Sequence, residues 1–335
     1  MICAPPAEFS RRGAMFSEEF FGFRLKRNRK SDILREPQKR RFAMADQIGR
    51  KLKVLMIGNS FTQSVPYFFP SIVEASGNDS LVLEMAAIGG YTLATHCSDY
   101  YKSEQNPEHR PYWTGFKQAS LHELLSEHKW DIVTVQQASD QSCNHPVSSW
   151  RADELISLIR HHQPEAEIMT QLIWAFRADD AAIRIPDGYW KFDQHEMYQR
   201  LLKSYGELAE THNLRVIPVG LAVEIAREKS PLKFKNYDPA ILDTLNPPDV
   251  PPQAGDPVGD IRWRKDEKTG ELFLYRDTSH MNVRGKYLQA CVWYILLYGR
   301  IAEDIKYIPK ELSDSEAKLL ARCAEQAVRE YKQVK

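Results

Sequence analysis

The sequence predicts a three-layer α/β/α protein in which helices cover both faces of a five-stranded, mainly parallel sheet. Short continuous apolar runs, typical of strands buried on both faces, alternate along the chain with segments of helical period. Strands that alternate with helices in this way form βαβ units, whose strands are parallel. The chain has 335 residues, 43% of them hydrophobic, which is enough for one large core.

The expected elements follow in chain order. Five apolar runs are the expected strands of the sheet, at 53–57, 81–87, 131–136, 167–176 and 215–221. Segments whose apolar residues recur at helical spacing are the expected helices, at 61–75, 121–128, 153–162, 195–212, 282–298 and from Ser313 to about 332. Ser313 and Glu316 form a capping-box pattern for the last helix, and Gly299 is suited to end the helix before it.

Two segments depart from the βα alternation. Six prolines fall within 232–260, which predicts a long irregular insertion, and 261–275 then resembles a hairpin that turns at Lys268-Thr269-Gly270. Residues 1–43 hold eleven Lys and Arg against five Asp and Glu, which predicts a disordered basic tail. A nucleic-acid-binding arm is the alternative for this tail, and Met44 is an alternative translation start. Residues 44–335 are expected to form one domain.

Composition excludes several classes of function. With 45 basic and 45 acidic residues the formal net charge is zero, so charge gives no case for binding nucleic acid or membrane lipid. No run approaches eighteen apolar residues, and no secretory signal is recognised, so we expect no membrane span and a cytoplasmic location. Five scattered cysteines without C-x-x-C argue against a disulfide framework or a zinc ribbon. We expect no metal and no organic cofactor. The oligomeric state stays open.

The segment KVLMIGNSFT places a serine where a nucleophile is expected. A buried strand runs into Gly58, Asn59 and Ser60, and the helix expected over 61–75 follows. Ser60 would therefore lie at the carboxyl edge of a parallel sheet, where open α/β folds place their sites. A nearby helix N-terminus would favour a developing oxyanion. The alternative reading is that Ser60 only caps the helix.

The segment DTSHMNVRGKYL supplies a complementary acid and base. Asp277 and His280 lie three residues apart just before the helix expected from residue 282. In a turn of this kind the carboxylate can bind Nδ1–H of the imidazole, which leaves Nε2 free to take a proton from a serine. A surface ion pair is the alternative for an isolated D-x-x-H.

Together these blocks resemble the SGNH (GDSL-like) hydrolases, over roughly residues 51–299. Gly58-Asn59-Ser60 matches the nucleophile block of that family, and Asp277 with His280 matches its terminal block. The segment IGGYT, 88–92, is similar to its glycine block. The resemblance implies a flavodoxin-like SGNH fold, a triad of Ser60, Asp277 and His280, and an oxyanion hole that includes the N–H groups of Ser60 and Gly90. G-N-S-F-T, the paired glutamines after the third strand and D-x-S-H are similar to an uncharacterised branch of the family.

The third block departs from the family pattern. Where the family has Gly-x-Asn-Asp, this chain has VQQASD, without the asparagine whose amide serves as an oxyanion donor. Gln137 is the expected replacement, because a Gln amide supplies the same donor with one more methylene. Gln136 and Ser139, which aligns with the asparagine, are the alternatives. A missing donor costs about 10²–10³ in rate, so a poor substitute predicts a slow enzyme rather than an inactive one.

The expected function is serine-dependent hydrolysis of a small acyl ester. A carbohydrate O-acetyl group is the preferred substrate by family analogy, with Trp113 and Trp174 as candidate sugar-stacking residues. Two alternatives stay open. The first is a catalytically silent ligand-binding protein, which the altered third block favours. The second is a lipid or acyl esterase or an acyltransferase, with aromatic residues near Ser60 as an acyl pocket.

Overall fold

The computed structural model describes residues 49–115 and 117–331. The predicted basic tail, 1–43, and the start at Met44 lie outside the described residues. A five-stranded sheet is built from β1 (Lys51–Gly58), β2 (Ser80–Ala87), β5 (Ile132–Val135), β6 (Glu167–Gln171) and β7 (Arg215–Ile217). The strand order is β2-β1-β5-β6-β7, and each neighbouring pair is parallel. The predicted fold class is confirmed.

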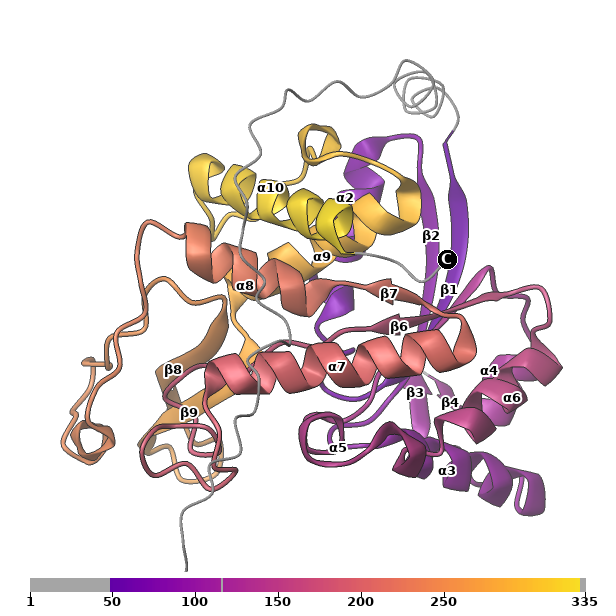
Figure 1. The fold of residues 1–335 in the computed structure, drawn as a ribbon, viewed down its shortest axis with the longest axis horizontal. Coiled ribbons are helices and arrows are strands. Elements are labelled where there is room, and N and C mark those ends of the chain that lie inside the picture. The colour runs from indigo at the N-terminus through magenta and orange to yellow at the C-terminus, as the bar shows by residue number, and fades with distance from the viewer. Residues whose placement is uncertain (1–48, 116, 332–335) are drawn as a thin grey trace, which may run out of the picture. The chain divides into compact units, whose positions relative to one another are not determined.

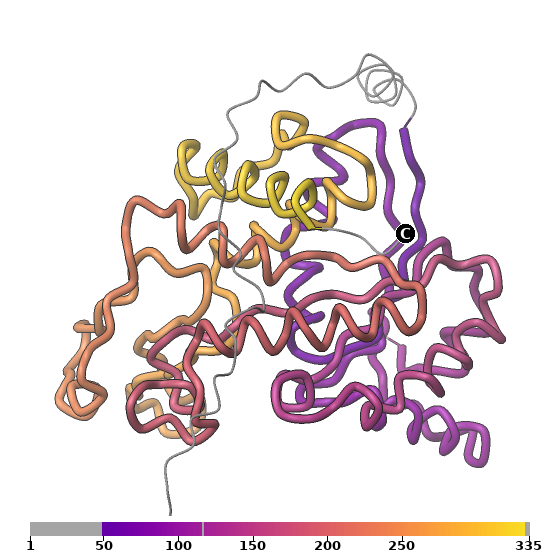
Figure 2. Tube along the Cα trace, viewed as in Figure 1, coloured from indigo at the N-terminus to yellow at the C-terminus, as the bar shows by residue number. Residues whose placement is uncertain are grey.

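Helices cover both faces of this sheet. Helix α9 (Val283–Tyr298) packs against α2 (Phe69–Ser76), α8 (Val219–Lys229) and α10 (Asp314–Glu330) on one face. Helix α7 (Gln194–His212) packs on β6 and β7 from the other face, with α8 and α7 on opposite sides of these strands in Figure 1. The tube in Figure 2 shows the early helix α2 beside the late helix α9, so segments far apart in sequence share one layer.

The remaining elements are further helices and two hairpins that are separate from the main sheet. They are the helices α3 (Leu93–Gln105), α4 (Leu121–Ser126), α5 (Ser139–Asn144) and α6 (Ala152–His162), the hairpin β3 (Tyr112–Thr114) and β4 (Lys117–Ala119), the hairpin β8 (Val258–Lys265) and β9 (Leu272–Met281), and the 3₁₀ helices η1 (Val65–Tyr67), η2 (Val147–Ser149), η3 (Pro239–Asp243) and η4 (Ala302–Asp304). The predicted insertion at 232–260 is irregular apart from η3 and the start of β8.

Several boundaries differ from the predictions at prolines. The helix expected over 61–75 begins only at Phe69, because Pro66 and Pro70 fit first turns and not a helix interior. Ser60 consequently lies in a turn rather than at the N-terminus of an α-helix. The fifth strand ends at Ile217, before Pro218, and α8 follows where more strand was expected. The fourth strand also ends early, at Gln171.

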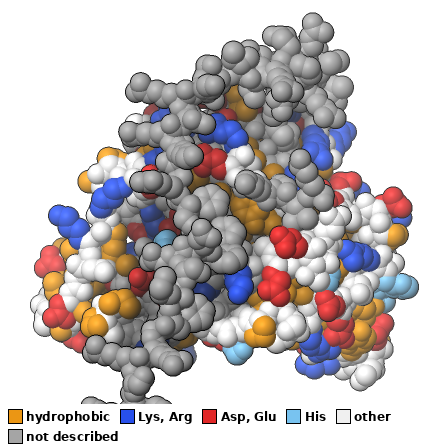
Figure 3. All heavy atoms as spheres, in the orientation of Figure 1, with side chains coloured by type: hydrophobic (Ala, Val, Ile, Leu, Met, Phe, Trp, Pro, Cys, Tyr) orange, Lys and Arg blue, Asp and Glu red, His pale blue; other side chains and the backbone are white. Residues whose placement is uncertain are grey.

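Three further structural facts bear on the expected properties. Among the described residues, no helix combines the length and apolar character needed to cross a bilayer. Cys97, Cys143, Cys291 and Cys323 are buried free thiols. Basic and acidic side chains are interspersed on the face drawn in Figure 3.

Candidate functional site

Ser60 follows β1 at the point where the strand order reverses. The chain leaves β1 toward β2 on one side, while β5 pairs with β1 on the other. Parallel sheets of this order open a crevice outside the carboxyl ends of the two strands that flank the reversal. The residues after β1 and after β5, which are Ser60 and the paired glutamines, therefore meet at one edge of the sheet.

Hydrogen bonds from several elements hold the turn that carries Ser60. Gln136 Oε1 accepts from Asn59 N at 3.2 Å and from Thr62 Oγ1 at 3.0 Å. Asn59 Nδ2 donates to the carbonyl of Tyr91 at 3.0 Å, which ties the turn to the glycine block. Gly58 must be glycine, because a Cβ there would lie 2.2 Å from Thr62 Oγ1. The turn is thus held in one conformation from three sides.

A buried histidine also fixes the end of β1. His96 on α3 is fully buried, and its Nε2 lies 3.0 Å from the carbonyl oxygen of Gly58. A carbonyl only accepts, so Nε2 carries the proton, and Nδ1 accepts from the Tyr112 hydroxyl at 2.8 Å. Burial lowers the pKa of His96 to about 4, although the Gly58 hydrogen bond and the charge of Asp99 offset part of the effect.

This histidine predicts a loss of stability in acid. The unfolded chain binds a proton near pH 6.5, whereas folded His96 binds it only near pH 4, so stability falls as the pH drops through this interval. Between about pH 7 and about pH 4.5 we expect His96 to account for about 2–3 kcal/mol of lost unfolding free energy. Urea denaturation of the wild type and His96→Gln at both pH values measures it. Equal pH dependence in the two proteins would contradict the assignment.

The structure brings the three predicted triad residues together. His280 Nε2 lies 2.9 Å from Ser60 Oγ, and His280 Nδ1 lies 2.9 Å from Asp277 Oδ2. A carboxylate only accepts, so the proton sits on Nδ1 and the lone pair of Nε2 faces the serine hydroxyl. The Asp277 side chain is 11% exposed and that of His280 44%, so the acid is enclosed while the base reaches solvent.

Asp277 and His280 lie on β9 rather than in the turn expected before α9. Asp277 Oδ1 accepts from the backbone N–H groups of Ser279 and His280 at 3.0 and 2.9 Å, so the carboxylate still folds back over its own segment. Burial raises the pKa of Asp277. The hydrogen bonds from His280, its positive charge and the backbone hydrogen bond from Ser279 outweigh this effect and hold the pKa well below its usual range. The carboxylate is therefore ionised at neutral pH.

Tyr275 is a second partner of Asp277 that the sequence reasoning missed. Its hydroxyl donates to Asp277 Oδ2 at 3.1 Å, the same oxygen that accepts from His280. Tyr275 and Asp277 lie two residues apart on β9, so the strand periodicity of two places them on one face. The alternation along a strand could have paired Tyr275 with Asp277, but the predicted hairpin ended at residue 275.

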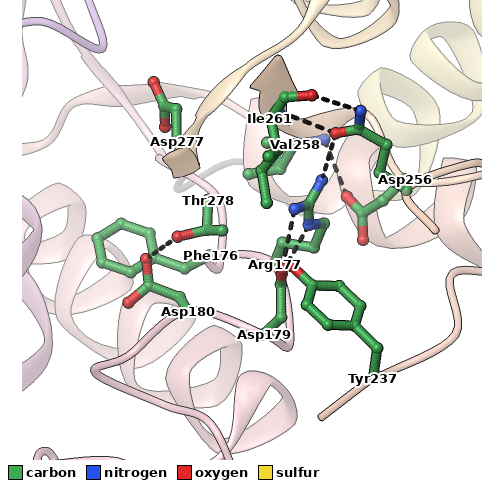
Figure 4. A network of polar contacts seen from close by, with 12 residues as sticks. Phe176, Arg177, Asp179, Asp180, Tyr237, Asp256, Val258, Ile261, Asp277 and Thr278 are labelled. Atoms are coloured by element: carbon green, nitrogen blue, oxygen red, sulfur yellow. Dashed lines mark hydrogen bonds and ion pairs between the residues drawn. The ribbon is translucent and has the colours of Figure 1, made fainter. Parts of the chain in front are cut away.

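Hydrogen bonds to Thr278 hold the part of β9 that carries Asp277 and His280 (Figure 4). Arg177 N donates to the carbonyl of Thr278 at 2.9 Å, and Thr278 Oγ1 donates to Asp180 at 2.6 Å. The Arg177 side chain is fully buried and forms a bidentate ion pair with Asp179, which also accepts from Tyr237. A buried charge is retained only with such partners. Tyr237 belongs to the 232–260 insertion, so this insertion helps to support the site.

The triad side chains open onto a cleft of about 340 Å³. Its lining comes from the Ser60 turn, η1, the segment after β6, the β8–β9 hairpin and the start of α9. The lining residues are Ser60, Gln63, Ser64, Tyr67, Trp174, Asp260, Arg262, Tyr275, Asp277, His280, Met281 and Lys286. Sequence reasoning did not single out Arg262 or Lys286. These two residues are 24 positions apart, and nothing in the sequence alone indicates that they lie in the same cleft.

The two tryptophans considered for sugar stacking occupy different places. Trp174 lines the cleft but is fully buried: its indole N–H donates to the carbonyl of Ser279 at 2.9 Å and its ring lies 4.6 Å from that of Phe61. Trp113 is 63% exposed on β3 and is not among the cleft residues. Tyr67, 56% exposed, is the aromatic residue of η1 that does line the cleft.

The oxyanion candidates lie around the Ser60 turn, although Gly90 and Gln137 are not cleft-lining residues. Gly90 is exposed with a φ of 77°. Gln137 is buried, and its Oε1 accepts from the backbone N–H groups of Leu93 and Ala138. Its Nε2 donor is buried and has no partner among the described residues. Gln136 is engaged, because its Nε2 donates to the Gln137 carbonyl and its Oε1 holds the turn. Ser139 begins α5 and is half-buried.

Within residues 49–115 and 117–331, no group of three or more His, Cys, Asp or Glu side chains is arranged to hold a metal ion.

Comparison with known proteins identifies the family. The family model described as "Domain of unknown function (DUF4886)" matches residues 53–237, more than half of the chain. A DUF4886 family protein from Bacteroides uniformis ATCC 8492 is a similar solved structure, with 23% identity, a TM-score of 0.62 and coverage of 84% of this chain and 95% of that chain. This likeness concerns the fold.

Two weaker structural matches are a candidate SGNH hydrolase from Slackia heliotrinireducens (15% identity, TM-score 0.42, 72% of this chain and 97% of that chain) and a member of the lipolytic protein G-D-S-L family from Veillonella parvula DSM 2008 (11%, 0.38, 72% and 95%). No match was found among the curated proteins. Because the family model matches residues 53–237, the chain belongs to the DUF4886 family.

Proposed function

We propose that this protein is a serine-dependent ester hydrolase of the SGNH type. The observation that carries the proposal is the hydrogen-bonded chain from Ser60 Oγ through His280 to Asp277, with both contacts at 2.9 Å. The three side chains line a cleft with room for a small ester. A nucleophile bonded to a base, and a base oriented by a carboxylate, is the arrangement used for acyl transfer.

The proposed reaction has two halves. Ser60 Oγ attacks the ester carbonyl carbon while His280 Nε2 takes the hydroxyl proton, and Asp277 stabilises the imidazolium that forms. The tetrahedral intermediate collapses, the C–O bond of the ester breaks, and His280 returns the proton to the departing alcohol. Water then attacks the acyl-enzyme through the same base, and the acid product leaves.

The oxyanion is proposed to bind the N–H groups of Ser60 and Gly90 and the Gln137 amide. Neither backbone N–H donates to another of the described residues, so both are available to a ligand. Gln137 Nε2 is a buried donor without a partner in the described part of the chain, and such a group is costly unless a ligand satisfies it. In this proposal the bound ester places its carbonyl oxygen against these three N–H donors.

Gln137→Glu tests the amide donor. Glutamate keeps the oxygen that accepts from Leu93 and Ala138 but replaces the donor with an acceptor. We expect kcat for p-nitrophenyl acetate to fall by about 10²–10³ with little change in the circular dichroism spectrum. An unchanged kcat would remove Gln137 from the oxyanion hole.

The preferred substrate is a small acyl ester, with a carbohydrate O-acetyl group as the specific candidate. Tyr67 offers an exposed aromatic ring at the cleft against which a sugar could pack. The experiment compares p-nitrophenyl esters of increasing acyl length and measures acetate released from acetylated sugars. We expect the acetyl esters to give the highest kcat/KM. Turnover of long acyl esters without acetate release would replace this substrate with a lipid ester, and absence of any turnover would favour a ligand-binding role.

A further inference from the structure

Two cations line the same cleft as Ser60 and His280. Arg262 comes from β8 and Lys286 from the first turn of α9. The hairpin turn and β9 separate these two residues in the sequence, and the fold brings them to one cleft. Both carboxylates of the cleft are already engaged: Asp277 by His280 and Tyr275, and Asp260 by an ion pair with Arg262. Arg262 is engaged by the same ion pair, so Lys286 is the charged side chain of this lining that has no ion-pair partner among the described residues.

Lys286 is the cation without a counter-ion. Its Nζ lies 4.3 Å from the centroid of the Tyr67 ring, and no acidic side chain in the described part of the chain pairs with it. Burial lowers the pKa of Lys286, the negative charges of Asp260 and Asp277 partly offset this, and the positive charge of Arg262 adds to the lowering. Lys286 is thus near enough to Arg262 for the two charges to repel, and an anion bound at Lys286 would offset this repulsion.

A bound anion would also stabilise Lys286 at its position on α9. Lys286 is the fourth residue of the helix, whose first turn holds no acidic residue. Helix N-termini carry a partial positive charge, so cations there normally cost stability. Arg284, in the same turn, is compensated by Glu316 at 2.7 Å, whereas Lys286 has no such partner among the described residues.

We propose that Lys286 forms an anion subsite beside the nucleophile, so that the enzyme selects esters carrying a carboxylate or phosphate on the acyl or the alcohol part. This inference rests on the proposed function and names the substrate class of that site. Lys286 is a specificity-determining residue: it binds the anion and takes no part in the proton transfers.

The test compares matched ester pairs. The anion lies on the alcohol part in 4-acetoxybenzoate, with its methyl ester as the neutral partner, and on the acyl part in mono-4-nitrophenyl adipate, with 4-nitrophenyl hexanoate as the partner. We expect the kcat/KM ratio of anionic to neutral ester to exceed one in at least one pair, and to fall about tenfold in Lys286→Met. Lys318→Met, an exposed lysine on α10 outside the cleft, should leave the ratio unchanged.

4-Acetoxyphenyl phosphate in the alcohol series distinguishes phosphate from carboxylate, and a preference for either supports the subsite. Ratios near one in every pair, or equal ratios in Lys286→Met and the wild type, would overturn it. Binding separates this result from failure of the proposed function. If no ester turns over, 4-acetamidobenzoate should still bind more tightly than its methyl ester in calorimetry, with the difference lost in Lys286→Met. Equal or absent binding of both amides would overturn the subsite as well.

Discussion

Ser60→Ala is expected to lower kcat for p-nitrophenyl acetate by about 10⁴–10⁶ while the protein stays folded. The hydroxyl removed is the one that faces His280 Nε2 at 2.9 Å, and no other serine hydroxyl in the described residues is hydrogen-bonded to that nitrogen. Removing the hydroxyl eliminates the acyl-enzyme route and leaves only the slower attack of water. Steady-state rates and circular dichroism on the two proteins give the measurement.

Ser157→Ala is the matched control. Ser157 lies on the exposed side of α6, and its hydroxyl bonds only the carbonyl of Asp153 in its own helix among the described residues. This variant should retain the wild-type kcat. Equal rates for Ser60→Ala and Ser157→Ala would mean that Ser60 is structural, and a ligand-binding function would become the better account.

Asp277→Asn is expected to lower kcat by about 10⁴. The amide keeps the shape of the side chain, but it can turn an N–H toward His280 Nδ1. The imidazole would then carry its proton on Nε2, where it cannot accept the proton of Ser60. The loss of the carboxylate also removes the charge that stabilises the imidazolium.

Two variants delimit this result. Tyr275→Phe removes one hydrogen bond to Asp277 Oδ2 and leaves the other, so its kcat should fall by about tenfold, far less than that of Asp277→Asn. Asp153→Asn changes an exposed carboxylate on α6 and should leave kcat unchanged. A kcat for Asp277→Asn within about tenfold of the wild type would show that Asp277 does not orient the base.

The sheet was predictable because its signal is local. Residues 54–57 of the predicted run at 53–57 are buried on both faces of β1, and the alternation of strands and helices predicts the parallel order. The D-x-x-H spacing and the G-N-S turn were also local signals, and the structure brings these side chains together. The errors in the first helix and the fifth strand occurred at Pro66, Pro70 and Pro218, where the position of a proline relative to a helix start decides the element. The early end of the fourth strand at Gln171 has no proline beside it.

The support of the site could not be predicted from the sequence, because it depends on distant pairs. Asp179 accepts from Tyr237, 58 residues later, and Thr278 donates to Asp180, 98 residues earlier. The meeting of Arg262 and Lys286 depends on how the hairpin lies over α9, which no periodicity encodes. The two adjacent glutamines likewise differ only through their partners, since Gln136 is fully engaged and Gln137 keeps a donor without one among the described residues.

Fluorophosphonate labelling tests the central claim most directly, because a phosphonylating reagent reacts with a serine only when a base activates it. Intact-mass measurement followed by peptide mapping locates the label. We expect about one equivalent of label, on the peptide that contains Ser60, with none on Ser60→Ala and much slower labelling of His280→Gln. Absence of label from the folded wild type, or equal labelling of the wild type and His280→Gln, would contradict a serine activated by His280.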